Sequence, residues 1–157
     1  MKRLIVLLCA VLMLTGCSGQ YAASGFGSSQ GDAGVAVGKV INGKAEVGVT
    51  GIAYAAEEDE YNPSAGVYAL WLAPTDPVIP TDEWQPVAGG ALTAVVEDGK
   101  AGFIPRGIIG VIKDPYDKIS LFGLAETSWP TNDIDSPEIR DREGTVFGWL
   151  GIRYRFN

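Results

Sequence analysis

The chain has 157 residues, which suits a single domain, and it is acidic, with a formal net charge of −7 at neutral pH. It contains no histidine, which excludes Ser-His-Asp hydrolysis, Cys-His catalysis and histidine-ligated zinc. The negative charge also argues against nucleic acid as a partner. We therefore expect a protein that is not an enzyme and that holds no cofactor and no metal ion.

The N-terminal segment, residues 1–16, has the organisation of an export signal. Lys2 and Arg3 precede an apolar run over 4–14. This run has the length of a signal-peptide core and is too short to span a bilayer as a helix. We expect the segment to be removed from the mature protein.

The sequence Leu14-Thr15-Gly16-Cys17 resembles the lipobox of bacterial lipoproteins. The resemblance implies cleavage before Cys17 and attachment of diacylglycerol and palmitate to this cysteine by the lipoprotein machinery. By the same resemblance, Ser18 in the next position points to the outer membrane as the location. Cys9 leaves with the signal, so no disulfide is expected within the mature chain. The alternative is an ordinary secretory signal in which Cys17 is incidental.

Residues 17–32, which follow the cleavage site, are small and polar and leave two interpretations open. Either they form a flexible tether between the lipid and the folded domain, or Gly19–Gly27 is a first strand with aromatic ends. We place the rest of the domain at 33–157.

The next segments predict a β-hairpin. Two runs of alternating apolar residues, 33–41 and 44–56, flank Asn42-Gly43. Asn-Gly is typical of the two-residue type I′ turn, which requires positive φ at both central positions. The acidic run 57–60 follows, with a loop expected to end near Pro63. This run has oxygen ligands for calcium, but a solvated group of charges is the simpler interpretation.

The remaining chain predicts further strands and loops. Residues 74–86 contain four prolines and are expected to form a stiff loop. Pro105 removes one backbone donor, so its strand should bend or be irregular there. A turn is expected over 113–117 and a long polar loop over 129–142. The expected strands in this part of the chain are 64–73, 88–97, 100–112, 118–128 and about 145–156.

The last strand alternates strictly between two kinds of side chain. Ile152, Tyr154 and Phe156 fall on one face, and Arg153 and Arg155 fall on the other. Arginines facing lipid near the bilayer centre would cost about 2–4 kcal/mol each, whereas arginines in a polar lumen can pair with carboxylates. The segment resembles the C-terminal assembly signal of outer-membrane barrels, and the positions that carry the resemblance are Gly151, Tyr154 and Phe156.

Together these features predict an all-β protein, a small antiparallel up-and-down barrel of about eight strands of the outer-membrane type. The N-terminus, the turn at 42–43 and the turn at 113–117 then share one end, and the loops at 57–63 and 129–142 share the other. Aromatic residues near the strand ends would form interfacial girdles. The alternative is a soluble β-barrel or sandwich that faces the periplasm on a lipid tether and serves in binding or envelope assembly.

Alternation also predicts which charged residues point into the barrel. We expect a paired lumen network of opposite charges, because an unpaired buried charge is costly; its members are Glu46, Arg106, Glu126, Arg153 and Arg155. No spacing supports a catalytic carboxylate pair of Glu46 and Glu126. The expected role is structural or recognition at the cell surface. The expected partners are outer-membrane lipid, the barrel and lipoprotein assembly machinery, and an unknown surface ligand.

Overall fold

The computed structural model describes residues 20–55, 61–73, 84–97, 100–116, 118–130 and 143–156. Several predicted features lie outside these residues. They are the signal segment with Cys17, the acidic run 57–60, the Asp98-Gly99 turn, and most of the loops at 74–86 and 129–142. No helix in the described part of the chain is long and apolar enough to cross a membrane.

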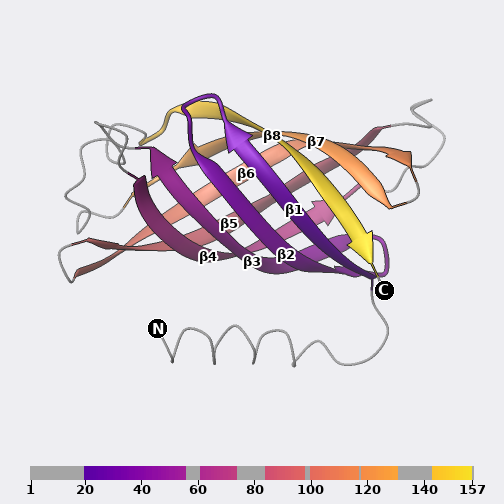
Figure 1. The fold of residues 1–157 in the computed structure, drawn as a ribbon, viewed down its shortest axis with the longest axis horizontal. Coiled ribbons are helices and arrows are strands. Elements are labelled where there is room, and N and C mark those ends of the chain that lie inside the picture. Colours follow the sequence, from indigo (N-terminus) through magenta and orange to yellow (C-terminus); the bar gives the residue numbers. More distant parts are fainter. Residues whose placement is uncertain are drawn as a thin grey trace.

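Eight antiparallel strands close into one barrel in chain order, and β1 completes the ring by pairing with β8 (Figure 1). The predicted eight-stranded up-and-down barrel is therefore confirmed. The strands are β1 (Gln20–Ser28), β2 (Ala33–Ile41), β3 (Ala45–Ala55), β4 (Tyr61–Leu72), β5 (Trp84–Glu97), β6 (Lys100–Tyr116), β7 (Ile119–Ser128) and β8 (Val146–Phe156).

The barrel has two distinct ends. At the terminal end, the right-hand end of Figure 1, β1 begins and β8 ends, and β2 is followed by β3, β4 by β5 and β6 by β7. At the loop end, β1–β2, β3–β4, β5–β6 and β7–β8 are joined. Because β1 starts at Gln20, the tether interpretation is wrong for residues 20–28, and the first-strand interpretation holds for them.

The hairpin of β2 and β3 forms at the predicted Asn42-Gly43 turn, but its connection has three residues and not two, because Ile41 is opposite Ala45. Asn42 and Gly43 have φ angles of 52° and 66°, the pair of positive values that a type I′ turn requires. The register on both sides is regular from Ile41 opposite Ala45 to Ala33 opposite Ala53.

Three strands are longer than the sequence predicted. Residues 61–63 and 84–86, expected in loops, belong to β4 and β5, and β6 continues through 113–116, expected as a turn. A register shift between Lys113 and Tyr116 accommodates this last extension. At Pro105 the pairing of β5 with β6 runs on without interruption, and the pairing of β6 with β7 begins only at the next residue, Arg106.

Pro86 and Pro105 are tolerated because each faces a place where a neighbouring strand has ended. The Pro86 carbonyl accepts a hydrogen bond from the Ala73 amide, one residue beyond β4. The Pro105 carbonyl accepts one from the Trp129 amide, one residue beyond β7. The nitrogen and carbonyl of one strand residue point to the same side, so neither proline removes a donor from the longer ladder on its other side.

The interior is filled by two clusters of apolar side chains. One, nearer the loop end, contains Ile52, Tyr54, Val95, Ile104, Phe147 and Trp149. The other, nearer the terminal end, contains Val40, Leu72, Val87, Ile112 and Phe122. Phe26 and Leu124 pack against both clusters. Such filling is expected because eight strands enclose a lumen only wide enough for side chains.

Gly66 shows how closely β4 approaches β5. A Cβ atom at Gly66 of β4 would lie 2.8 Å from the Thr93 Cα of β5, closer than Cβ contacts allow. Thr93 has no exposed surface and is opposite Gly66 in the register, so it has little room to move. In contrast, a Cβ atom at Gly25 on the outer face of β1 would meet nothing within 4 Å.

We therefore expect Gly66→Ala to destabilise the barrel by about 1–3 kcal/mol, the usual range for overpacking. Gly25→Ala serves as the matched control and should leave stability unchanged. The measurement is the urea dependence of folding into lipid vesicles, followed by tryptophan fluorescence. Equal stability of the two variants would contradict the close approach of β4 and β5.

Candidate functional site

A charged group lies inside the barrel near the terminal end. Arg153 of β8 contacts Glu46 of β3, with 2.5 Å between Nη2 and Oε2. The Tyr68 hydroxyl of β4 donates a hydrogen bond to the other Glu46 oxygen at 2.6 Å. Both charged side chains are at most 5 % exposed. The carboxylate thus has a cation on one oxygen and a neutral donor on the other, which compensates its burial.

A second ion pair lies inside the barrel and joins the adjacent strands β6 and β7. Arg106 Nη1 is 3.0 Å from Glu126 Oε2, and both side chains are buried. Their strands are adjacent, and Glu126 stands opposite Ile108, two residues along from Arg106, so the pair is diagonal on the inner face. Sequence alternation had placed both residues on the inner face but gave no partner for either.

Arg155, the fifth residue of the predicted lumen network, is not part of either buried group. It begins on the inner face, opposite Ala22, but its side chain reaches the rim of the terminal end. There its Nη2 lies 2.7 Å from Asp114 Oδ2, with both side chains partly exposed. Inward pairing is therefore found for four of the five predicted residues, and Arg155 instead pairs at the rim. The described residues form two separate buried groups and one rim pair.

Two participants were missed from the sequence. Tyr68 lies in a strand that is apolar on both faces, so its hydroxyl gave no indication of an inward direction. Asp114 lay in a predicted turn, whereas it belongs to the end of β6. The signal that would have found Tyr68 is the register of β3 with β4, which sets Tyr68 opposite Gly48, two residues from Glu46.

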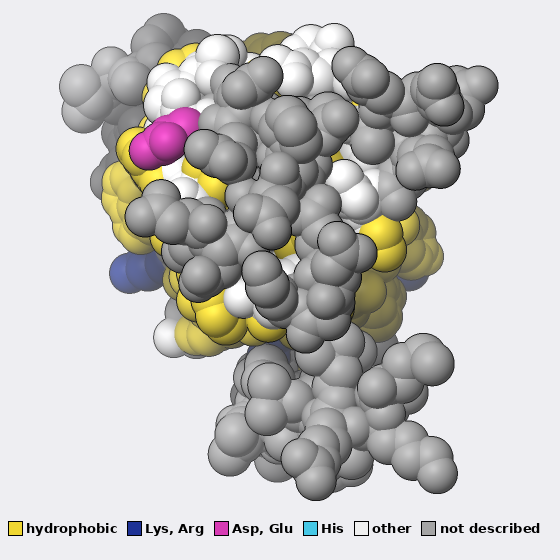
Figure 2. Space-filling view, turned by 90° about the vertical axis from the view of Figure 1, so that its left-hand side faces the viewer, with side chains coloured by type: hydrophobic (Ala, Val, Ile, Leu, Met, Phe, Trp, Pro, Cys, Tyr) yellow, Lys and Arg dark blue, Asp and Glu magenta, His cyan; other side chains and the backbone are white. Residues whose placement is uncertain are grey.

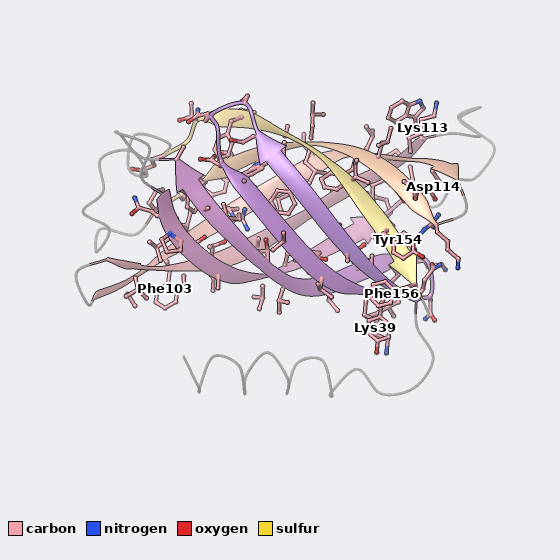
Figure 3. All side chains as sticks on the ribbon, viewed as in Figure 1. Lys39, Phe103, Lys113, Asp114, Tyr154 and Phe156 are labelled. Carbon is pink, nitrogen blue, oxygen red and sulfur yellow. The ribbon has the colours of Figure 1, made fainter. Side chains whose placement is uncertain are left out.

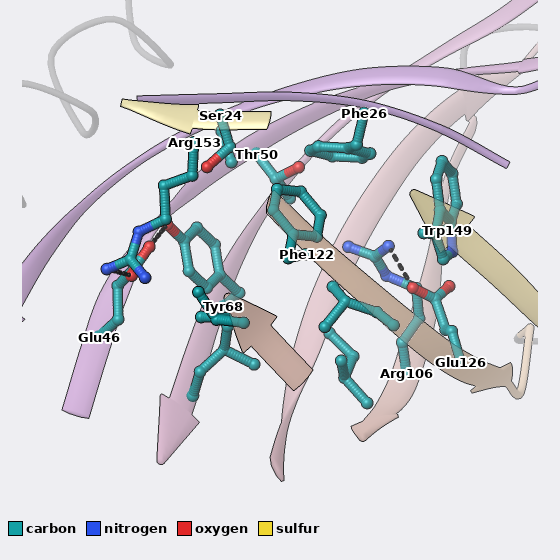
Figure 4. A pocket seen from close by; sticks show the side chains of 15 residues that line it. Ser24, Phe26, Glu46, Thr50, Tyr68, Arg106, Phe122, Glu126, Trp149 and Arg153 are labelled. Atoms are coloured by element: carbon teal, nitrogen blue, oxygen red, sulfur yellow. Dashed lines mark hydrogen bonds and ion pairs between the residues drawn. The ribbon is translucent and has the colours of Figure 1, made fainter. Parts of the chain in front are cut away.

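Aromatic rings separate the two ion pairs, as Figure 4 shows. The ring of Phe26 lies 6.3 Å from that of Phe122 and 5.2 Å from that of Trp149, both in edge-on arrangements. Phe147 continues the series 6.0 Å from Trp149. These contacts make a continuous aromatic packing through the middle of the lumen.

A small cavity of about 70 Å³ remains between the two groups, bordered by Glu46, Arg153, Arg106 and Glu126 among others. It has room for a few water molecules but is well below the roughly 300 Å³ of a typical small-molecule site. Glu46 and Glu126 each have their own arginine, an arrangement that neutralises charge. Within the described ranges, no group of metal-ligating side chains is close enough to hold an ion.

The outer face of the wall is apolar. Among the outward-facing strand side chains that the structure describes, only Lys39 and Lys113 are charged, and both lie at the terminal end (Figure 3). In Figure 2, which looks onto the loop end, the visible flanks of the barrel are hydrophobic. Large exposed side chains of the wall include Val35, Val67, Leu92, Ile109, Val111, Leu121, Leu150 and Ile152.

The residues of the predicted assembly signal lie on the strand that closes the barrel. Tyr154 and Phe156 point outward at the terminal end, and their rings stack at 6.4 Å. Phe156 also stacks on Tyr21 of β1 at 5.9 Å. Gly151 lies against the ring of Phe122. Their use as a recognition signal during assembly stays a prediction.

Solved structures with a similar fold are bacterial envelope barrels. The N-terminal β-barrel domain of Pseudomonas aeruginosa OprF matches with a TM-score of 0.61 and 13 % identity, over 88 % of this chain and all of that domain. The fold is that of the small outer-membrane β-barrels. Neisserial surface protein A (NspA) matches with a TM-score of 0.52 and 17 % identity, over 88 % of this chain and 94 % of that one. No family model and no curated protein sequence matches the chain.

The ion pair of Glu46 and Arg153 can be tested with a double-mutant cycle. Arg153→Met leaves the buried carboxylate without its cation, and we expect a loss of about 3–5 kcal/mol. Adding Glu46→Gln to Arg153→Met should restore most of this loss, because no buried charge is then left unpaired. Stability is measured by urea titration in vesicles.

The rim pair provides the control for this cycle. Arg155→Gln removes a partly exposed ion pair and should change stability by at most about 1 kcal/mol. A loss as large as that of Arg153→Met, or no recovery in the double variant, would contradict the description of a buried compensated pair.

Proposed function

We propose that the chain is an outer-membrane β-barrel lipoprotein with a structural or surface-recognition role and no enzymatic activity. The observation that carries the proposal is the sorting of charge in the wall. The charged strand side chains that the structure describes face the lumen in compensated pairs or lie at the terminal end, and the described outer face between the ends is apolar. This is the arrangement that a barrel in hydrocarbon requires.

The same sorting argues against the alternative of a tethered soluble domain. Soluble monomers rarely expose a continuous apolar patch of more than a few hundred Å². Here large apolar side chains cover the outer face of six strands, β2 and β4–β8. The outward residues of β1 and β3 are mostly smaller. A soluble barrel would leave this belt in water.

Lipid attachment at Cys17 is compatible with the position of β1. Gln20 begins β1 at the terminal end, so Cys17 precedes the barrel by only three residues. Three residues span at most about 11 Å, so a lipid at Cys17 would enter the leaflet at the terminal end. The loop end would then face the exterior, which places the β3–β4 and β7–β8 connections where a surface ligand can reach them.

The inner face supports a closed barrel rather than a pore. The two apolar clusters and the aromatic packing fill the lumen on either side of the small cavity. Recognition would therefore depend on the connections at the loop end, as is common for long surface loops on a rigid scaffold.

The test expresses the full chain and a Cys17→Ala variant in bacteria fed an acyl-chain probe. Isolated outer membranes are then run boiled and unboiled on a denaturing gel. We expect label only in the wild type and a heat-dependent shift in both, because the strands and not the lipid hold the barrel in the bilayer. Absence of label from the wild type would overturn the lipoprotein assignment. A heat-independent band, with the body released by protease, would overturn the barrel assignment.

A further inference from the structure

The cavity between the two ion pairs has a polar wall that the strand register builds. Arg153 of β8 is directly opposite Ser24 of β1. Ser24 is opposite Ala36 of β2, and Ala36 is in turn opposite Thr50 of β3. All four residues border the cavity, and the register places them side by side on the inner face. This wall therefore presents a guanidinium group, two hydroxyl groups and one small side chain.

Both arginines that border the cavity keep one hydrogen-bond donor in reserve. Their terminal Nη atoms make the ion pairs, Arg153 with Glu46 and Arg106 with Glu126. The Nε atom of each arginine is buried and has no hydrogen-bond acceptor among the described residues. A buried donor without an acceptor is costly, so such groups in native proteins are bonded to protein or to ordered water.

The hydroxyl groups of the polar wall can take part in the same hydrogen bonding. Thr50 Oγ1 donates to the Val35 carbonyl at 3.2 Å, which leaves its lone pairs able to accept. Ser24 can both donate and accept. Figure 4 shows Ser24 and Thr50 between the two ion pairs, beside the rings of Phe26 and Phe122. The polar groups thus meet a cavity whose remaining surface is apolar.

Charge and volume together restrict what can occupy this cavity. Its charged lining residues are two arginines and two glutamates, and each glutamate is paired with one arginine. An added ion would therefore enter the lumen without a counter-charge, which is costly. The volume of about 70 Å³ admits only a few small molecules. Water fits, because it is neutral and both accepts and donates hydrogen bonds.

We propose that the cavity is a binding site for ordered water, and that this water accepts hydrogen bonds from the Nε atoms of Arg106 and Arg153. The inference goes beyond the proposed function. It joins the two buried groups into one hydrogen-bonded network across the lumen. The ion pairs of β6 with β7 and of β3 with β8 then stabilise the barrel together.

The experiment is nuclear magnetic resonance of the full chain, labelled with ¹⁵N-arginine and folded in detergent micelles. Magnetisation transfer from water to the Nε–H protons is measured in the laboratory frame and in the rotating frame. A long-lived bound water gives cross-peaks of opposite sign in the two measurements, whereas proton exchange gives the same sign. We expect opposite signs at Arg106 and Arg153.

A matched pair of variants locates the water in the cavity. Ala36→Leu fills the cavity from its polar wall and should remove both cross-peaks. Ala33→Leu makes the same substitution on the exposed outer face of the same strand and should retain them. If Ala36→Leu does not fold, Thr50→Val removes one hydroxyl at nearly unchanged volume and should lower both intensities about twofold. Each variant is first checked for the heat-dependent gel shift.

Xenon distinguishes a hydrated cavity from a dry one, because dry apolar cavities bind this atom. We expect xenon pressure to cause no saturable shift in the ring resonances of Phe26 and Phe122. Saturable xenon binding at these rings would overturn the proposal, as would absence of bound-water cross-peaks from the folded wild type. Cross-peaks that persist in folded Ala36→Leu would place the water outside the cavity and would also overturn it.

Discussion

The pairing of β1 with β8 is the contact on which the rest of the structure depends. It joins eight consecutive residues of β1, from Tyr21 to Ser28, to the run from Phe156 back to Trp149. Without it, both strands would present unpaired backbone groups, which a bilayer does not tolerate. With it, the backbone hydrogen-bonding needs of the strands are met within the ring, so the outer side chains alone determine what surrounds the barrel.

Closure also gives each strand an inside and an outside, and the two-residue period of a strand then assigns every side chain to one of them. The inside is narrow, so charges placed there must be compensated at short range. Glu46 meets Arg153 and Tyr68, and Arg106 meets Glu126. Among the outward-facing strand side chains that the structure describes, only Lys39 and Lys113 are charged, and both lie at the terminal end. Stability and the proposed membrane location thus depend on the same alternation.

Much of this fold could be predicted from local patterns. Asn42-Gly43 indicated its turn because few residues adopt the positive φ angles that it requires. The alternation of β8 indicated which arginines face inward. Strand ends were less accessible, because Pro86 and Pro105 are tolerated only where the neighbouring strand has stopped, and that depends on register.

The partners inside the lumen could not be predicted either. Glu46 and Arg153 are far apart in the sequence and come together only through closure, and Tyr68 joins them through the register of β3 with β4. Arg155 lies on the same face of β8 as Arg153. It pairs with Asp114 at the rim because it is two residues closer to the end of the strand. The face on which a residue lies follows from the sequence of its own strand. Its distance from the rim depends on the register of all the strands around the barrel.

The central claim, that the outer wall faces hydrocarbon, can be measured with nitroxide spin labels in lipid vesicles. No cysteine follows Cys17, so single cysteines can be placed in turn at Val35, Ile109 and Leu150, with Lys44 in a turn as the control. We predict that dissolved oxygen reaches the three wall positions and that a water-soluble nickel chelate reaches only the position in the turn. Free access of the chelate to Ile109 and Leu150 in the folded protein would contradict the account.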